Sequence, residues 1–197
     1  MKNPIIGLTS KDGLPIQENF KLHPLIGISG KARSGKDTLG RFLCDSYHCL
    51  HYYFAKPLKE GAKVMFNLSD EQIENKEVPI KPWGISPRKI YQLLGTEVGR
   101  GIDSNVWVKN AEMFVDDNPG RSVVITDCRF DNEALWIRNR GGIVINIERD
   151  QGSIIEHGHS SEGGLKPDNI NLTINNNGSI EDMCNEVTYY MQQGMTV

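Results

Sequence analysis

The chain has 197 residues, a length that suits one globular domain or one domain with an insertion. Hydrophobic residues make up 38% of it and charged residues 24%, which excludes a wholly disordered chain. A formal net charge of −3 argues against a protein that coats nucleic acid or an anionic membrane by bulk charge, and no apolar run approaches the roughly 18 residues that span a bilayer.

The apolar pattern predicts an α/β domain. Short apolar runs that indicate buried strands lie at 25–29, 51–54, 122–126, 143–147 and 171–174. The third and fourth runs show almost no polar alternation, which is typical of parallel strands covered on both faces. Helical periodicity follows the first run from Leu39 onward, and Ser179 with Asp182 predicts the capped start of a last helix. Strand–helix alternation of this kind favours a doubly wound fold.

Three segments fall outside this alternation. Residues 1–24 precede the first predicted strand, and we expect them to form an N-terminal extension of a domain at 25–197. About 65 residues separate the second predicted strand from the third, which predicts a helical insertion at about 56–118. Residues 175–178, Asn-Asn-Asn-Gly, predict a turn.

The cysteines give no sign of metal or disulfide chemistry. Four occur, and none of them forms a C-x-x-C pair. We therefore expect reduced thiols, as in a cytoplasmic protein.

A glycine-rich loop between the first strand and the first helix is the most informative feature. It runs Gly30-Lys31-Ala32-Arg33-Ser34-Gly35-Lys36-Asp37-Thr38, which nearly matches the phosphate-binding pattern G-x-x-x-x-G-K-[ST]. The glycines allow backbone N–H groups to curl around a phosphate, and the helix adds the positive end of its dipole. We expect Lys36 to reach the β- and γ-phosphates of a nucleotide. Asp37 replaces the usual Ser or Thr and is a candidate magnesium ligand, directly or through water.

Other motifs narrow the class of reaction. GTPases need an N-K-x-D motif that reads the base, but Asn75-Lys76-Glu77 is followed by Val78 and lies in the insertion. Motor ATPases usually end a strand in Asp-Glu, whereas Asp127 at the end of the third strand has no adjacent Glu. With GTPases and motor ATPases disfavoured, the remaining class of phosphate-loop enzyme is a small-molecule kinase.

Asp127 and Arg129 are candidates for the catalytic edge of the sheet. In open α/β sheets, ligands bind at the carboxyl ends of the strands. There Asp127 is suited to coordinate magnesium or polarise an acceptor oxygen, and Arg129 to neutralise phosphate charge. The alternative is a strand-end Asp that caps the helix starting near Asn132.

The insertion carries a second set of candidate anion ligands. We expect one helix from Arg88 to Gly99, on which Arg88, Gln92, Gly95 and Gly99 share a polar face. Arg88 is suited to grip a monophosphate with two hydrogen bonds, and Gln92 to read a base or sugar edge. The alternative is an ordinary solvated helix face.

Further candidates flank this helix. Lys56 directly follows the second strand and Arg100 directly follows the helix, so both are candidate phosphate contacts. Trp83 and Trp107 are candidates to stack on a base, with a place in the core as the alternative for each. A loop-like segment at about 149–168 is expected to form a lid over the nucleotide.

Taken together, these motifs resemble the bacteriophage deoxynucleoside monophosphate kinases of the P-loop nucleoside monophosphate kinase superfamily. The resemblance covers most of residues 25–190 and is carried by residues 30–38, 54–59, 92–97 with Arg100 and Trp107, 125–133, and His159-x-Ser161-Glu162. The phosphate loop with Asp37 is the most specific segment, although phosphomevalonate kinases of the animal type are similar there. The Gln-Leu-Leu-Gly-Thr-Glu segment at 92–97 favours the nucleotide kinases.

The resemblance implies a three-layer α/β/α P-loop kinase fold. Its parallel sheet would have five strands in the order 2-3-1-4-5, with a helical monophosphate-binding region and a lid. It implies transfer of the γ-phosphate of ATP, with Mg²⁺, to a deoxynucleoside 5′-monophosphate, in the host cytoplasm for a phage protein. Neither nucleic acid nor a membrane is an expected partner, and a homodimer is common among such kinases.

The resemblance also implies roles for individual residues at matching positions. ATP and Mg²⁺ would be held by Gly30, Ala32, Arg33, Ser34, Gly35, Lys36, Asp37 and Thr38, with the metal at Asp37 and Asp127. The acceptor would be held by Lys56, Arg88, Gln92, Arg100, Asp127, Arg129 and Glu133. We add Ala55, Trp83, Gly95 and Trp107 as further candidates for this site. Lys36, Asp127 and Arg129 are the expected catalytic groups.

Two other functions stay open on the residues alone. One is a kinase for another phosphorylated metabolite, such as dephospho-coenzyme A or phosphomevalonate. The other is a non-catalytic module that binds ATP as a switch. An intact Lys36 with several candidate acceptor cations disfavours the switch, because a switch has no use for a second phosphate site.

Overall fold

The computed structural model describes residues 23–150 and 164–192. The chain divides into two compact units: unit 1 comprises residues 1–52 and 119–197, and unit 2 comprises residues 53–118. Most of the predicted extension at 1–24 and of the predicted lid at 149–168, including His159, Ser161 and Glu162, lies outside the described residues. Within the part of the chain that is described, no helix is long and apolar enough to cross a bilayer.

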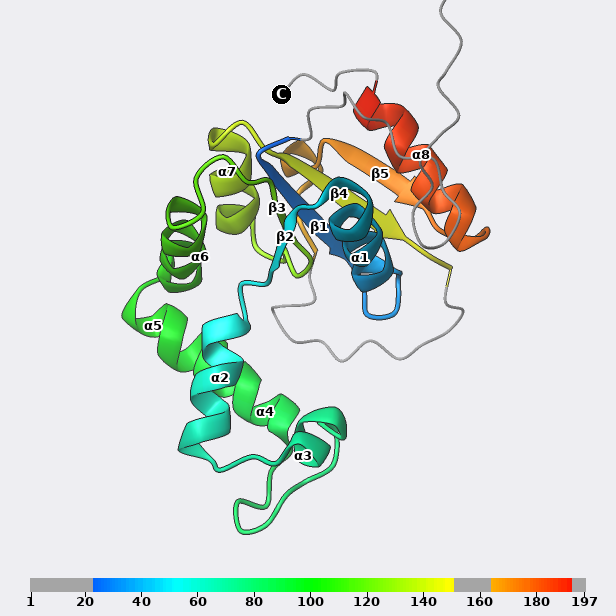
Figure 1. The fold of residues 1–197 in the computed structure, drawn as a ribbon. Coiled ribbons are helices and arrows are strands. Elements are labelled where there is room, and N and C mark those ends of the chain that lie inside the picture. The colour runs from blue at the N-terminus through cyan, green and yellow to red at the C-terminus, as the bar shows by residue number, and fades with distance from the viewer. Residues whose placement is uncertain (1–22, 151–163, 193–197) are drawn as a thin grey trace, which may run out of the picture. The chain divides into compact units, whose positions relative to one another are not determined.

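Unit 1 is built on a parallel sheet (Figure 1). The described strands are β1 (Leu25–Gly30), β2 (Leu50–Tyr52), β3 (Val123–Ile125), β4 (Ile143–Glu148) and β5 (Leu172–Asn175). They form a five-stranded sheet in the order β2-β3-β1-β4-β5, and every adjacent pair is parallel. The predicted strands, their direction and the order 2-3-1-4-5 are therefore confirmed, with shifts of one or two residues at the ends.

Helices cover both faces of this sheet (Figure 1). Helices α1 (Lys36–Tyr47) and α8 (Ile180–Gln192) lie on one face, where Ile26 and Ile28 of β1 join their apolar cluster. Helix α7 (Asp131–Asn139) lies on the other face, where a Cβ on Gly27 would stand 2.5 Å from Ile137 Cδ1. Val123–Ile125 and Ile143–Ile145 are fully buried, which confirms that both faces are covered. The result is the predicted three-layer fold.

The predicted start of the last helix is also confirmed. Ser179 Oγ accepts a hydrogen bond from the N–H of Asp182 at 3.1 Å, and the N–H of Ser179 donates to Asp182 Oδ2 at 3.0 Å. This reciprocal pair is a capping box, and its hydrogen bonds hold the pKa of the Asp182 carboxyl below its usual value. It fixes where the chain turns from β5 into α8.

Unit 2 is helical, as predicted. Its helices are α2 (Lys56–Met65), α3 (Asp70–Glu74), α4 (Pro87–Gln92), η1 (Leu93–Gly99), α5 (Arg100–Ile102) and α6 (Val106–Asp116), with one isolated antiparallel bridge between Ile80 and Ile85. It has its own small apolar cluster, which contains the buried residues Ala62, Leu68, Ile80 and Ile90. Unit 2 thus packs around a core of its own.

The predicted single α-helix from Arg88 to Gly99 is wrong in its second half. The α-helix α4 ends at Gln92, and η1 is a π-helix, whose backbone hydrogen bonds run from i to i+5. The wider turn removes Gly95 and Gly99 from the face expected to carry Arg88 and Gln92. Both glycines are buried instead, and a Cβ on Gly95 would lie 2.9 Å from Leu58 Cδ2.

Gly99→Ala is expected to destabilise the protein by about 1–3 kcal/mol, because the added methyl group overpacks a filled site. A Cβ there would overlap the indole ring of Trp107 and lie 3.0 Å from the carbonyl oxygen of Leu94. The matched control is Gly101→Ala, where no atom lies within 4 Å, so the free energy of unfolding should stay equal or rise slightly. Urea unfolding measures both, and equal stability of the two variants would contradict the packing described here.

Candidate active site

The phosphate loop at 30–38 has the strained backbone that its sequence predicts. Gly30 and Gly35 adopt φ values of +139° and +109°, and Arg33 adopts +62°, all in the left-handed region. A Cβ on Gly30 would lie 2.7 Å from Ser34 Oγ. Helix α1 begins after Gly35 without a side-chain cap, so its first turn offers backbone N–H groups to a ligand.

Four charged side chains gather at the carboxyl edge of the sheet in unit 1. β1 and β3 are adjacent and parallel, so the loop after β1 and Asp127 after β3 emerge at the same edge. Burial and the charge of Arg129 lower the pKa of Lys36 to about 8, while the charges of Asp37 and Asp127 oppose this shift. The Lys36 ammonium donates a hydrogen bond to the carbonyl oxygen of Lys31 in its own loop. The structure thus brings the charged groups of Asp37, Asp127 and Arg129 close enough to act on Lys36.

These residues fit a phosphate-bound magnesium ion. Among the described residues, no group of three or more His, Cys, Asp or Glu side chains is placed to hold a metal by itself. Magnesium in phosphoryl-transfer sites needs only one or two carboxylates, because phosphate oxygens and water complete its shell. Asp37 and Asp127 supply two. The buried Ser34 Oγ, which has no hydrogen-bond partner among the described atoms, adds an unused polar group to the loop.

Glu133 lies beneath this edge and bonds to backbone. Its side chain is almost fully buried, and Oε2 accepts hydrogen bonds from the N–H groups of Arg129 at 2.8 Å and Phe130 at 3.1 Å. The carboxylate therefore holds the turn that carries Arg129. The neighbouring Cys128 is buried, and burial raises the pKa of its thiol well above the usual value, with Glu133 and Asp127 adding to the shift. All four cysteines are free thiols.

A cavity of about 400 Å³ opens beside Asp37, lined also by Arg41, Cys44 and His51. Arg41 and Cys44 follow Asp37 at helical spacing on α1, and His51 Nε2 lies 2.9 Å from Thr126 Oγ1. Arg41 and His51 lie in no sequence motif, and the sequence analysis did not name them.

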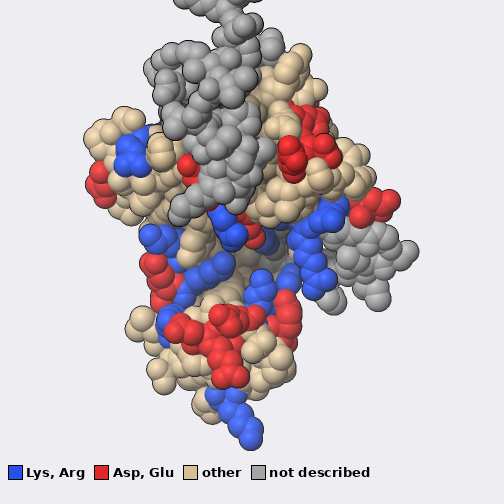
Figure 2. All heavy atoms as spheres, turned by 45° about the vertical axis from the view of Figure 1, so that its right-hand side comes forward, with Lys and Arg blue, Asp and Glu red and all other residues tan. Residues whose placement is uncertain are grey.

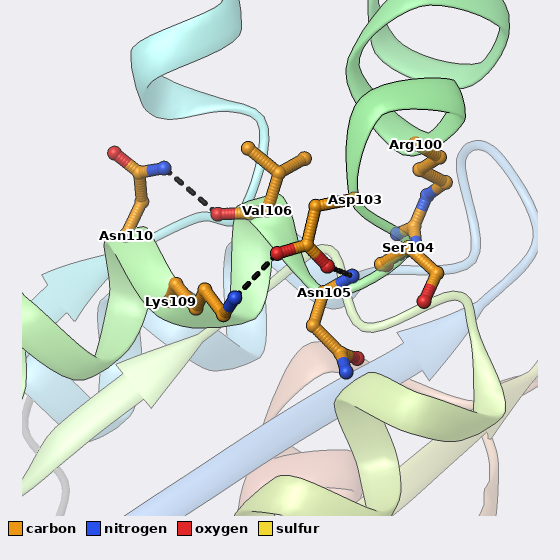
Figure 3. Close-up of polar contacts among 7 residues, drawn as sticks. All are labelled: Arg100, Asp103, Ser104, Asn105, Val106, Lys109 and Asn110. Atoms are coloured by element: carbon orange, nitrogen blue, oxygen red, sulfur yellow. Dashed lines mark hydrogen bonds and ion pairs between the residues drawn. The ribbon is translucent and has the colours of Figure 1, made fainter.

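Arg88 and Arg100 of unit 2 both hold polar partners within that unit. Arg88 Nη1 pairs with Glu77 Oε1 at 2.8 Å, with the Glu77 side chain 61% exposed. Arg100 Nη1 donates to the carbonyl oxygen of Ser104 at 2.9 Å (Figure 3). Asp103, beside it, pairs with Lys109 and accepts from the N–H of Asn105 at 2.8 Å, which fixes this turn (Figure 3). Glu77 and the Ser104 carbonyl are both exposed, so water or an anion can replace these two partners.

Trp107 packs inside unit 2. Its ring fills the space above Gly99, and its Nε1–H donates to the carbonyl oxygen of Gly95 at 2.9 Å. The ring and this hydrogen bond support the π-helix from outside. The sequence placed Trp107 either on a base or in the core, and its present contacts are those of a packing residue.

The other predicted side chains of unit 2 are more accessible. Trp83 is 46% exposed, meets Phe66 edge-on with ring centroids 5.1 Å apart, and donates Nε1–H to the Phe66 carbonyl oxygen at 3.2 Å. Lys56 Nζ lies 5.6 Å from the centre of the Phe114 ring. Gln92 is the half-buried last residue of α4, and Ala55 directly precedes α2.

Asn176 is a residue at the phosphate loop that the sequence analysis assigned only to a turn. It is 5% exposed, and its Nδ2 donates to the carbonyl oxygen of Ser34 at 2.7 Å. One signal was present in the sequence. The two-residue period of β5 places Asn176 on the same buried side as Ile174, where an asparagine needs a polar partner.

The described surface carries charges of both signs. On the face drawn in Figure 2, Lys and Arg side chains lie among Asp and Glu side chains. Local cations such as Lys36 and Arg129, rather than bulk charge, therefore supply the positive potential at the phosphate loop.

Comparison with known proteins identifies the family. The model of the family described as deoxynucleotide monophosphate kinase matches residues 24–83 and 62–187. A protein of Acanthamoeba polyphaga mimivirus that carries this family's name is 36% identical over 83% of this chain and 93% of its own length. The deoxynucleoside-5′-monophosphate kinase of Escherichia phage T5 is 26% identical over 72% of this chain and 84% of its own.

The solved structures agree on the fold. The crystal structure of TT1252 from Thermus thermophilus superposes with a TM-score of 0.50 at 17% identity, over 88% of this chain and 99% of that one. This likeness concerns the fold alone. The family model and the mimivirus relative carry the assignment, and they confirm the resemblance seen in the motifs. The chain belongs to the deoxynucleotide monophosphate kinase family.

Proposed function

We propose that this protein transfers the γ-phosphate of ATP to a deoxynucleoside 5′-monophosphate, giving a deoxynucleoside diphosphate and ADP. The observation that carries the proposal is the gathering of Lys36, Arg129 and the two carboxylates at the phosphate loop. Family membership supports it, because relatives from mimivirus and phage T5 are named as kinases of these monophosphates.

ATP is proposed to bind at the phosphate loop of unit 1. The backbone N–H groups of the loop and the first turn of α1 would surround the phosphates, with Lys36 at the terminal one. The residues proposed to contact ATP are Gly30, Ala32, Arg33, Ser34, Gly35, Lys36, Asp37 and Thr38. Asp37 and Asp127 would hold Mg²⁺, which when bound neutralises phosphate charge.

Residues of unit 2 are proposed to bind the acceptor, and Asp127 and Arg129 of unit 1 are proposed to act on its phosphate. Arg88 would exchange its exposed partner Glu77 for the monophosphate, at little cost because exposed ion pairs contribute little. Arg100 and Lys56 would add positive charge, and Gln92 and Trp83 would meet the nucleoside. Ala55 would contact the acceptor through its backbone. Gly95 and Trp107 would support the site indirectly, through the π-helix that directly precedes Arg100.

The catalytic task is one of positioning and neutralisation. Two anions repel each other, and little covalent chemistry is required once they are aligned. Lys36 and Arg129 would offset the charge on the transferred phosphoryl group, and Asp127 would polarise the acceptor oxygen. Glu133, held under the Arg129 turn, would keep that arginine in place.

A panel of acceptors tests this function. ADP release would be measured with ATP and Mg²⁺, first alone and then with each of the four deoxynucleoside monophosphates, with ribonucleotides and with dephospho-coenzyme A. At least one deoxynucleoside monophosphate should raise turnover far above the ATP-only rate. Turnover with dephospho-coenzyme A alone would reassign the acceptor, and ATP binding without any turnover would favour the switch.

ATP affinity is expected to weaken above pH 8. The pKa of Lys36 is about 8 in the nucleotide-free protein, and the protonated amine binds phosphate. Below this pH the group is already charged and the dissociation constant should be flat. Above pH 8 the Lys36 amine must first take up a proton before it can bind phosphate. The dissociation constant of ATP should therefore rise by up to about tenfold per pH unit. Calorimetric titration from pH 6.5 to 9.5 checks this, and Lys36→Arg should remove the dependence. A flat profile for the wild type would contradict the assignment.

A further inference from the structure

Asn176, which directly follows the edge strand β5, hydrogen-bonds to both strand β4 and the phosphate loop. Its backbone N–H donates to the carbonyl oxygen of Glu148, at the end of β4, at 2.7 Å. Its side-chain Nδ2 donates to the carbonyl oxygen of Ser34 at 2.7 Å. A carbonyl only accepts hydrogen bonds, so the amide must face Ser34 with its nitrogen. The contact spans 142 positions of the chain, and both residues are almost fully buried.

This hydrogen bond sets the direction of the next N–H group. The Ser34 carbonyl and the Gly35 N–H belong to one planar trans peptide, so they point in opposite directions. With the oxygen aimed at Asn176, the Gly35 N–H is aimed away from it. Gly35 has φ +109° and no Cβ, so this peptide would otherwise rotate at little cost. A Cβ on Gly35 would lie 2.5 Å from Asn176 Nδ2, so the close approach itself also requires a glycine.

We propose that Asn176 is a positioning residue, which holds the Ser34–Gly35 peptide so that the Gly35 N–H faces the phosphates of the bound nucleotide. The proposal rests on the proposed function of the loop and assigns Asn176 no contact with substrate. Ser34 is 1% exposed, so water does not readily replace the amide. Without Asn176 the Ser34 carbonyl would be buried and unsatisfied, and turning it inward would point its oxygen at the phosphate oxygens.

The neighbouring asparagines provide internal controls. Asn175 is exposed at the end of β5, and Asn177 Oδ1 accepts a hydrogen bond from the N–H of Asp150 at 2.7 Å. Both flank Asn176 directly in the chain and carry the same amide side chain. Asn175→Ala therefore removes an identical side chain one position away without touching the phosphate loop.

The test compares wild type, Asn176→Ala, Asn176→Asp and Asn175→Ala by ATP titration calorimetry and by steady-state kinetics with a deoxynucleoside monophosphate. Asn176→Ala should raise the dissociation constant and KM for ATP about tenfold, the effect of one lost hydrogen bond to a group that stays buried. The KM for the acceptor should stay within about twofold, as should every constant of Asn175→Ala.

Asn176→Asp supplies a readout that a merely structural role would not move. At pH 7.5 its carboxylate repels the Ser34 carbonyl, so ATP binding should weaken more than in Asn176→Ala. As the pH falls to 5.5 the protonated acid becomes a donor, so the ratio of variant to wild-type dissociation constants should fall.

Two results for Asn176→Ala would overturn the proposal. One is an equal rise in the KM values for ATP and for the acceptor. The other is a lower kcat with both KM values unchanged, which is what a loss of folded protein produces. A wild type that binds ATP but phosphorylates no deoxynucleoside monophosphate would overturn the proposed function alone. The dissociation constants would then still decide the role of Asn176.

Discussion

Lys36→Ala is expected to lower kcat by on the order of 10³-fold or more, while the protein stays folded. The ammonium is the cation of the phosphate loop, and the charges of Asp37, Asp127 and Arg129 all act on it. Burial already disfavours its charged form, so removing it should not destabilise the fold. Initial rates of ADP formation measure the loss, and circular dichroism confirms the fold.

The matched control for this variant is Lys31→Ala. Lys31 is exposed in the same loop and contributes its backbone carbonyl to Lys36, which the substitution keeps. Its kcat should remain within about threefold of wild type, the effect of a surface charge. Comparable losses in the two variants would mean that net charge, rather than the placement of Lys36, governs the rate.

Arg100→Ala is expected to raise the KM for the acceptor by about 10- to 100-fold and to leave the KM for ATP unchanged. Arg100 follows the π-helix, and its Nη1 donates to the carbonyl oxygen of Ser104 (Figure 3). In the variant, water can donate a hydrogen bond to the exposed Ser104 carbonyl. The substitution should therefore weaken acceptor binding without lowering the stability of the fold. Steady-state kinetics with each substrate varied in turn separates the two KM values.

Lys89→Ala is the control for the acceptor site, since Lys89 is an exposed cation on the neighbouring helix α4. It should change neither KM by more than about twofold. If Arg100→Ala instead raised the KM for ATP, Arg100 would belong to the nucleotide end of the reaction and our acceptor assignment would be misplaced.

The sheet and the phosphate loop were predictable because their signals are local. Parallel strands buried on both faces contain continuous apolar runs, as in Val123–Ile125 and Ile143–Ile145. The loop residues 30–38 are consecutive, and their glycines determine the backbone. Asp127 emerges at the same carboxyl edge of the sheet as the phosphate loop, because strands β1 and β3 are parallel neighbours.

The features that were missed depend on contacts between distant parts of the chain. The π-helix is supported by Trp107 and Leu58, which pack against glycines that a helical wheel would place on an open polar face. Asn176 contacts Ser34 across 142 positions, and although the strand period marks it as buried, no local pattern names its partner. The carboxylate of Glu133 bonds to the backbone of Arg129, and no sequence pattern reports that orientation.

Transfer of label from ATP to the acceptor tests the central claim most directly. ATP carrying ³²P in the γ-position would be incubated with Mg²⁺ and each deoxynucleoside monophosphate, and the products separated by chromatography. The account predicts label in a deoxynucleoside diphosphate, in an amount equal to the ADP formed, and on the order of 10³-fold slower labelling with Lys36→Ala. Label recovered only as inorganic phosphate, with every acceptor in the panel, would contradict it.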